Sequence, residues 1–392
     1  MNHDKPSIKV LHVLICLDSG GVETLLLDFF KRLPGHVHFD FLVMHPGVRD
    51  HVAREKGANI FVMSPETIKK PWQLGKDIAK LIDKHNYNIV HCHRLIFNGH
   101  ILYHARRAGV PIRIVHSHHT IFQEASWLKR FFYTPWHYTM NRIMLALHAT
   151  DILACSHEAG RFLMGRFWKR HAKCRPLFNG IPIDEFARKM EISTRDELCE
   201  QYGIPRDAVV VGHLARMAPV KNQQLLIEAF AILARKNPKV VLFIGGQGEL
   251  RPQLECQCRA LGISDRVFMP GFCSNSPELL GNLFDVFCLP SIAEAFGIVL
   301  IEAVAAGLPS VCSDVISRDI LSRFPDRITS LPLHANPQVW ADALEKALST
   351  KIPRENGIAR IKDASMTTAS QFDELMTIYE KVYRTGNSIA KP

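Results

Sequence analysis

The chain alternates short apolar runs with amphipathic segments of helix length, and this series restarts near residue 181. Uninterrupted apolar strands separated by helices are typical of parallel sheets that are covered on both faces. The first series contains expected strands at Val10–Leu14, Phe39–Val43, Ile60–Met63, Ile89–His91, Ile112–Val115 and Ile152–Ala154. The second contains expected strands at Val209–Gly212, Val240–Ile244, Val267–Met269, Val286–Leu289 and Ser310–Cys312. Two such series in 392 residues predict an α/β protein with two Rossmann-like domains.

A turn-rich stretch separates the two series. The sequence NGIPIDEF, within Asn179–Arg188, punctuates the chain at this point. We therefore expect an N-terminal domain at residues 1–180 and a C-terminal domain at residues 181–369. No strand follows the last expected helix, so we expect the C-terminal segment, residues 370–392, to pack back on the first domain.

The net charge of +10 is concentrated in the first half of the chain. Residues 1–180 contain 25 Lys and Arg against 13 Asp and Glu, whereas the rest contains 23 against 25. A basic half favours an anionic partner, which could be nucleic acid, an anionic membrane or a phosphorylated acceptor. A basic nucleic-acid-binding protein is disfavoured because no recognised nucleic-acid motif accompanies the charge.

Cellular location is predicted from the apolar runs and the cysteines. No apolar run reaches the ~18 residues that cross a bilayer, and Gly-Gly follows the first apolar stretch without a cleavage pattern. The ten cysteines follow no regular framework, so we interpret them as reduced. We therefore expect a cytoplasmic protein.

The segment PSIAEAFGIVLIEAVAAGLPSVCSD, residues 290–314, contains two acids on either side of an expected helix start. Glu294 lies in the loop after a strand, and Glu302 lies on the second turn of the helix. The helical rise separates them by about 10–12 Å. The helix start at Phe296–Ile298 offers N–H groups and a positive dipole end to a phosphate. One segment could thus hold hexose hydroxyls, a diphosphate and ribose hydroxyls.

This segment resembles the signature of the family 4 retaining glycosyltransferases, which have the GT-B fold and read roughly S-x-x-E-x-F-G-x-x-x-x-E-A-x-A-x-G-x-P-V. The residues in register are Ser291, Glu294, Phe296, Gly297, Glu302, Ala303, Ala305, Gly307 and Pro309, and Ser310 replaces the usual Val. The resemblance implies two Rossmann-like domains facing each other across a cleft, with the acceptor bound by the first and the nucleotide-sugar by the second. The donor-binding residues it implies are Glu294, Phe296, Gly297, Ile298 and Glu302.

Further matches cover nearly the whole chain. VVVGHLARMAPVKNQQLLIEAF resembles the family's G-R-x-x-x-x-K element, although Gly212 and Arg216 are four residues apart here. The resemblance assigns Arg216 and Lys221 to the donor diphosphate, where two cations neutralise the leaving group without a metal ion. RVFMPGF resembles the family's base-reading loop, which puts Phe272 near the base ring.

The first half also contains residues that match the family. LDSGGVETLLLDFF resembles its first loop, where Gly20 and Gly21 would present backbone N–H groups to the distal phosphate or the acceptor. The family usually has a His directly after the strand that corresponds to Ile112–Val115. This makes His116 the first choice, and His118 the second, for contact with the transferred sugar.

Two His-x-His motifs end neighbouring expected strands. The motifs HCH and HSH contain His91, His93, His116 and His118. Imidazoles spaced in this way can ligate zinc, but no acid or thiol clearly completes the set. We keep zinc as an alternative and expect no metal and no other cofactor.

The segment of residues 121–148 is both aromatic and basic. Trp127, Lys129, Arg130 and Phe131 are its most concentrated part. A buried helix and an interfacial helix that touches anionic lipid are both compatible with this composition. In the second case these four residues form a membrane or acceptor surface at the inner face of the membrane.

The resemblance implies a retaining, metal-independent hexosyltransferase of cell-surface polysaccharide biosynthesis. Its donor would be a UDP- or GDP-sugar, and its acceptor a saccharide or lipid-linked saccharide. The expected catalytic residues are His116, Arg216, Lys221 and Glu294. A nucleotide-sugar epimerase of the same fold is an alternative, but it would use catalytic carboxylates rather than an Arg/Lys pair.

Overall fold

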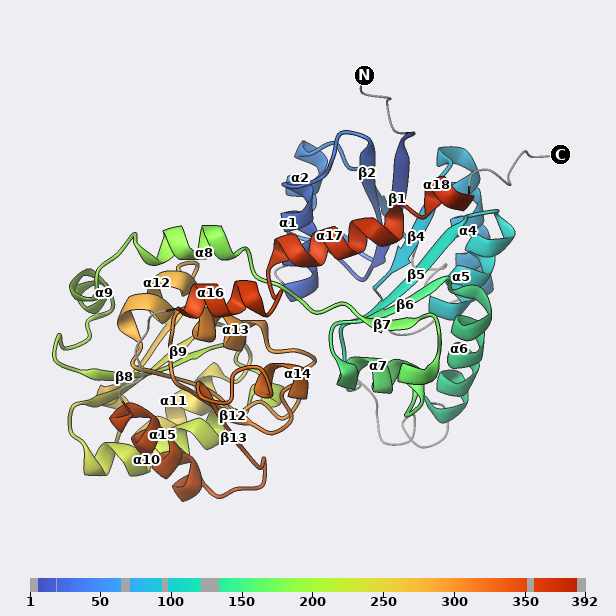
Figure 1. The fold of residues 1–392 in the computed structure, drawn as a ribbon. Coiled ribbons are helices and arrows are strands. Elements are labelled where there is room, and N and C mark those ends of the chain that lie inside the picture. The colour runs from blue at the N-terminus through green and yellow to red at the C-terminus, as the bar shows by residue number, and fades with distance from the viewer. Residues whose placement is uncertain are drawn as a thin grey trace. The chain divides into compact units, whose positions relative to one another are not determined.

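A computed structural model describes residues 6–18, 20–64, 71–93, 98–120, 134–350 and 356–385. The chain forms two compact units, each built around its own parallel sheet (Figure 1). The first unit consists of Met1–Asn179 together with Thr368–Pro392, and the second of Gly180–Thr367. No helix among the described residues has both the length and the hydropathy to cross a bilayer.

The first unit has a seven-stranded sheet with the order β3-β2-β1-β4-β5-β6-β7. Its strands are β1 (Ile8–Leu14), β2 (Val37–Val43), β3 (Ile60–Val62), β4 (Ile89–Cys92), β5 (Ile112–Ser117), β6 (Asp151–Ala154) and β7 (Cys174–Pro176). Its helices are α1 (Gly21–Phe30), α2 (Asp50–Glu55), α4 (Pro71–His85), α5 (Asn98–Arg107), α6 (Thr134–His148), α7 (His157–Met164), the 3₁₀ turn η2 (Trp168–Arg170), α17 (Thr368–Tyr379) and α18 (Val382–Thr385). Strand order reverses at β1, which pairs in parallel with both β2 and β4.

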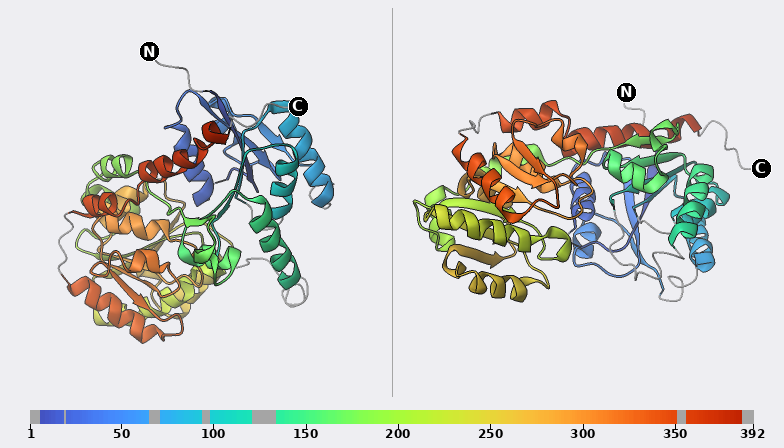
Figure 2. Two further views of the ribbon diagram at one scale, coloured as in Figure 1. Left: turned by 45° about the vertical axis from the view of Figure 1, so that its right-hand side comes forward. Right: turned by 90° about the horizontal axis from the view of Figure 1, so that it is seen from below.

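Alternate residues of these strands fill two separate cores, as the period of two requires. One face, with Val10 and Ile114, packs against α1 and the C-terminal helix α17. The opposite face, with Val13 and Val115, packs against α4, α5 and α6, which Figure 2 shows along the other side of this sheet. The first unit is therefore a three-layer α/β structure whose last helix comes from the far end of the chain.

The second unit repeats this plan with the strand order β10-β9-β8-β11-β12-β13. Its strands are β8 (Val209–Leu214), β9 (Val240–Gly245), β10 (Val267–Gly271), β11 (Val286–Leu289), β12 (Ser310–Ser313) and β13 (Ile328–Leu331). Its helices are α8 (Ile183–Met190), α9 (Arg195–Tyr202), η3 (Pro219–Lys221), α10 (Gln223–Lys236), α11 (Arg251–Ala260), η4 (Ser264–Arg266), α12 (Ser276–Glu278), η5 (Leu279–Leu283), α13 (Ile298–Ala305), α14 (Arg318–Leu321), α15 (Pro337–Ser349) and α16 (Gly357–Asp363). The predicted α/β class with two Rossmann-like sheets is confirmed.

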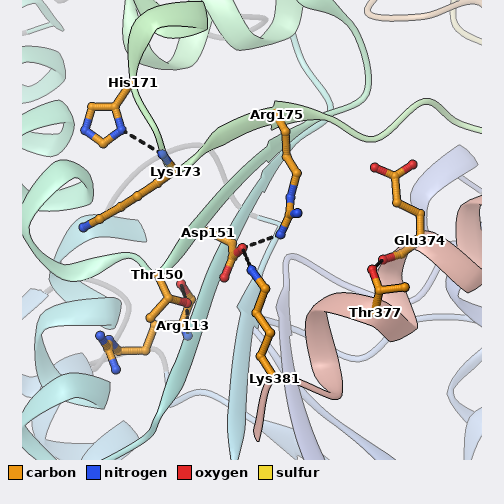
Figure 3. Close-up of polar contacts among 9 residues, drawn as sticks. All are labelled: Arg113, Thr150, Asp151, His171, Lys173, Arg175, Glu374, Thr377 and Lys381. Atoms are coloured by element: carbon orange, nitrogen blue, oxygen red, sulfur yellow. Dashed lines mark hydrogen bonds and ion pairs between the residues drawn. The ribbon is translucent and has the colours of Figure 1, made fainter. Parts of the chain in front are cut away.

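Polar contacts also hold the C-terminal segment on the first unit. Asp151, at the start of β6, has a nearly buried carboxylate that accepts hydrogen bonds from Arg175 of β7 and from Lys381. The Lys381 Nζ lies 2.7 Å from Asp151 Oδ1. Figure 3 shows the carboxylate between these two cations. One carboxylate of β6 thus contacts both the neighbouring edge strand β7 and the segment that follows α17.

We predict that Asp151→Asn lowers the free energy of unfolding by about 1–2 kcal/mol, because it removes the carboxylate that both cations share. Urea denaturation followed by circular dichroism measures the change. The control is Asp342→Asn, which breaks an exposed contact with Lys236 and should change stability far less than Asp151→Asn does. Equal effects of the two substitutions would contradict this role for Asp151.

Candidate functional site

The reversal of strand order in the second unit marks the candidate site. Strand β8 pairs with β9 on one side and β11 on the other, so the loops that follow β8 and β11 diverge at the carboxyl edge. In open parallel sheets, ligands bind at this switch point. The loop after β8 contains Arg216 and Lys221, and the loop after β11 contains Glu294. The structure thus places these three predicted residues at the same edge of one sheet.

Lys221 and Glu294 form an ion pair across this switch point. Their Nζ and Oε2 atoms are 2.5 Å apart, and both side chains remain about one-fifth exposed, at 21% and 19%. The two loops are also joined through the backbone, because the Ile292 N–H donates to the Val220 carbonyl at 2.8 Å. A cation and an acid that neutralise each other can each turn to a ligand group, the cation to a phosphate and the acid to hydroxyls.

A buried polar chain holds the loop that carries Arg216. Gln223, the first residue of α10, donates from Nε2 to the Arg216 carbonyl at 2.9 Å, and its Nε2 lies 3.3 Å from His213 Nε2. The His213 ring donates from Nδ1 to the Cys288 carbonyl of β11 at 2.8 Å. Burial lowers the pKa of His213 to about 4. The neutral His213 ring can therefore donate to the Cys288 carbonyl and accept a hydrogen bond from Gln223. Gln223 in turn fixes the backbone of Arg216, and the Arg216 side chain stays exposed.

Gln223 and His213 are supporting residues that no sequence motif predicted. A signal was present, because both are polar residues in elements that are otherwise largely apolar. The loop after β9 comes very close to the loop after β8 at Gly246, where φ is +143°. A Cβ atom there would lie 2.0 Å from the Ala215 carbonyl oxygen, so only glycine permits this contact.

The start of α13 presents its backbone at the same edge. Gly297 is the N-cap with φ +97°, a conformation that favours glycine, and Phe296 before it is buried. The N–H groups of Ile298 and Val299 have no acceptor within the helix, whereas the Leu300 N–H donates to the Gly297 carbonyl at 2.9 Å. Glu302 lies one turn further along, partly buried, and burial raises the pKa of its carboxyl to about 7. The arrangement offers N–H donors at the helix start and a carboxyl group behind them.

The other predicted residues lie elsewhere in the two units. Phe272 follows edge strand β10 and is 66% exposed. Gly20 and Gly21 are exposed at the start of α1 in the first unit, where Gly20 is the N-cap. His116 is buried in β5, and His118 follows that strand. The predicted membrane-surface residues Trp127, Lys129, Arg130 and Phe131 lie outside the described residues.

Among the described residues, the side chains that lie close enough together to hold a metal ion are histidines. Two overlapping sets, both in the first unit, place one ring nitrogen of each member within 4.8 Å of the others: His12, His91 and His93, and His93, His116 and His118. The second unit contributes the cations and the helix start instead. The side chains that could hold a metal ion and the Arg216, Lys221 and Glu294 cluster therefore belong to different units.

Two parallel sheets that share a 3-2-1-4-5-6 order, extended by a seventh strand in the first unit, with basic residues at the switch point of the second, are typical of the GT-B class of two-domain transferases. Comparison with known proteins gives the family. Residues 19–185 match the family described as Glycosyltransferase Family 4, and residues 194–363 match Glycosyl transferases group 1. The chain belongs to glycosyltransferase family 4 and is a glycosyltransferase.

Several known proteins are similar to this chain over most of its length. EpsF of Bacillus subtilis, named as a glycosyltransferase, is 30% identical over 89% of this chain and 90% of its own length. An Escherichia coli α-1,3-galactosyltransferase is 27% identical over 82% of this chain and 83% of its own length. The solved structure of Anabaena HepE in complex with UDP has a TM-score of 0.73 at 19% identity, covering 97% of this chain and 100% of that one. This last likeness supports the GT-B fold.

The raised pKa of Glu302 predicts a pH-dependent stability. The pKa of Glu302 rises from the ordinary value of 4.5 to about 7 in the folded protein. Between these pH values the unfolded chain has lost the Glu302 proton that the folded protein retains, so stability falls as pH rises through this window. Glu302→Gln removes this loss. Relative to wild type, the variant should gain about 1–3 kcal/mol of unfolding free energy between pH 5 and pH 8.

Urea unfolding at several pH values tests this expectation. The exposed Glu228 on α10 provides the control, because Glu228→Gln should follow the wild-type profile. Parallel profiles for wild type and Glu302→Gln would contradict a buried carboxyl at this position.

Proposed function

We propose that the enzyme is a retaining hexosyltransferase that moves a sugar from a UDP- or GDP-sugar to a saccharide or lipid-linked acceptor. The observation that carries this proposal is the switch point of the second unit, where Lys221 pairs with Glu294, Glu294 lies beside Gly297 at the start of α13, and Arg216 lies in the same loop as Lys221. The E. coli relative is named as a galactosyltransferase that uses UDP-Gal and a diphosphoundecaprenol-linked sugar. A Staphylococcus aureus relative is named for capsular polysaccharide biosynthesis. We assign this chain to cell-surface polysaccharide biosynthesis on the same basis.

The donor is proposed to lie along the carboxyl edge of the second sheet. Its diphosphate would receive the N–H groups of Gly297 and Ile298, with Arg216 and Lys221 as counter-charges in place of a metal ion. Binding would separate the Lys221–Glu294 pair, freeing Lys221 for phosphate and Glu294 for the hexose hydroxyls. Glu302 would accept hydrogen bonds from the ribose diol, and Phe272 would lie near the base.

Retention requires the acceptor hydroxyl to attack from the face on which the diphosphate leaves. The leaving phosphate would take the acceptor's proton as the bond to the anomeric carbon breaks. The enzyme's contribution is then to stabilise the negative charge that develops on the diphosphate and to orient both substrates. Gly20 and Gly21 would contact the distal phosphate or the acceptor, and His116 would contact the transferred sugar.

Described surface residues of the first unit support contact with an anionic membrane. Helix α6 exposes Met140, Ile143 and Leu147, which share one face by their spacing of three and four residues. After α7, Phe167 is exposed, and the guanidinium of Arg166 lies over one face of its ring, 4.5 Å from the centroid. Apolar side chains beside cations are typical of surfaces that bind anionic lipid.

Arg216→Ala should lower kcat/KM by about 10²–10³-fold, because it removes a charge that stabilises the leaving group. Glu302→Ala should mainly weaken donor binding, by roughly tenfold, through loss of the ribose contacts. Transfer assays and a thermal-shift panel of UDP, GDP and their sugars measure both effects. Arg235→Ala, exposed at the far end of α10, is the matched control. Full activity in both site variants would refute the proposed site.

A combined replacement of Trp127, Lys129, Arg130 and Phe131 by Ser should reduce binding to vesicles of phosphatidylglycerol and phosphatidylcholine. The physical reason is the loss of both apolar insertion and charge attraction. Co-sedimentation measures the bound fraction, with pure phosphatidylcholine vesicles as the neutral reference. Ile192 is an exposed apolar residue of the second unit, and the control substitution Ile192→Ser should leave the bound fraction unchanged. Unaltered sedimentation of the fourfold variant would exclude these residues as a membrane surface.

A further inference from the structure

Five buried histidines gather at the switch point of the first sheet. They are His12 in β1, His91 in β4, His93 directly after β4, His116 in β5 and His118 directly after β5. All are at most 8% exposed. His12 is the register partner of His91, and the spacing of two residues within each His-x-His motif keeps its members on one face. This is the face that packs against α1 and α17.

The imidazoles contact one another rather than acids. His93 Nε2 lies 3.1 Å from His12 Nδ1, and His93 Nδ1 lies 3.1 Å from His118 Nε2. His91 Nδ1 lies 2.8 Å from the hydroxyl of Tyr379. Burial lowers the pKa of each of these rings, that of His12 to about 3, so they are neutral at physiological pH.

Several ring nitrogens of the cluster have no hydrogen-bond partner within the described part of the chain. Each neutral ring has one N–H donor and one bare acceptor nitrogen. Four ring nitrogens have no hydrogen-bond partner among the described residues: His12 Nε2, His91 Nε2, His116 Nε2 and His118 Nδ1. Unpartnered polar atoms at such burial are rare, and an ion that ligates them is one explanation.

We propose that His12, His91 and His93 bind one divalent transition-metal ion of the zinc class. These residues each offer a ring nitrogen within 4.8 Å of the other two. Small ring rotations bring such atoms to the separation of roughly 3.3 Å that two ligands about 2.0–2.1 Å from one zinc ion have. A set made only of imidazoles suits zinc, cobalt, nickel or copper, and does not suit magnesium or calcium, which take oxygen ligands.

Tyr379 favours this set over the overlapping one. Histidines that bind a metal through one nitrogen usually give the other N–H to a second group, which fixes the ring. The hydroxyl of Tyr379 can accept the Nδ1–H of His91, and this tautomer would leave Nε2 for the ion. Cys92, between His91 and His93, belongs to the opposite core and adds no thiolate. Three ligands leave a fourth position open, toward the edge where His93 is 7% exposed.

The proposed ion connects the sheet to the end of the chain, because Tyr379 belongs to α17. An ion that binds only the folded protein stabilises it by mass action. This site does not depend on the proposed donor chemistry, which uses residues of the second unit. Metal binding can therefore be measured without donor, acceptor or activity.

The experiment uses the full-length protein after removal of metal with a chelator. Equilibrium dialysis against Zn²⁺, with elemental analysis, should give one bound ion per chain, and Co²⁺ should give visible absorption bands of a low-coordinate site. Zn²⁺ should also raise the melting temperature. Failure to bind either ion stoichiometrically would overturn the proposal.

Substitutions identify the ligands. His12→Asn and His91→Asn should each lose stoichiometric binding, whereas the surface variant His51→Asn should retain it. His118→Asn should keep binding within a few-fold, and its loss together with retention by His12→Asn would overturn the assigned set. If the ligand variants fail to fold, Tyr379→Phe decides, because it keeps the core packing. It should weaken Zn²⁺ binding by about 10–100-fold, and unchanged affinity would reject the proposal.

Discussion

Parallel pairing of one central strand with a neighbour on each side is the constraint on which both sites depend. In the second sheet β8 pairs with β9 and β11, and in the first sheet β1 pairs with β2 and β4. Right-handed crossovers then place the helices that follow two such neighbouring strands, such as α1 after β1 and α5 after β4, on opposite faces, so that their loops diverge at the carboxyl edge. The same backbone rule therefore places diverging loops at the switch point of each unit, where we propose a donor site and a metal site, and the side chains decide what each could bind.

The two positions differ in their electrostatics. At the second switch point, Lys221 and Glu294 pair while partly exposed, so their charges remain available to a ligand. At the first, desolvation keeps the rings of His12 and His91 uncharged. Charged donors suit a phosphate, whereas neutral imidazole nitrogens suit a soft or borderline cation. A metal ion among the imidazoles would thus leave the counter-charge of the diphosphate to Arg216 and Lys221.

The sequence predicted the fold because its central strands are continuous apolar runs and its glycines and acids match a family signature in register. It missed edge strands β7 and β13, where half-buried or exposed polar residues such as Thr329 hide the apolar pattern. The Arg216–Lys221 loop and Glu294 could be placed on one sheet edge from strand order. The contact of Gln223 with the Arg216 carbonyl could not, since it depends on how a helix start packs against a loop.

The histidine cluster shows the same limit more sharply. The His-x-His motifs were visible in the sequence, but His12 is an isolated histidine in a largely apolar strand, 79 positions before His91. Tyr379 lies 288 positions after His91 and reaches it because α17 returns to the first unit. Without that return His91 would lack the hydroxyl that orients its ring. The C-terminal helix therefore completes the core on that face of the sheet and also contacts His91, one of the two fully buried proposed metal ligands.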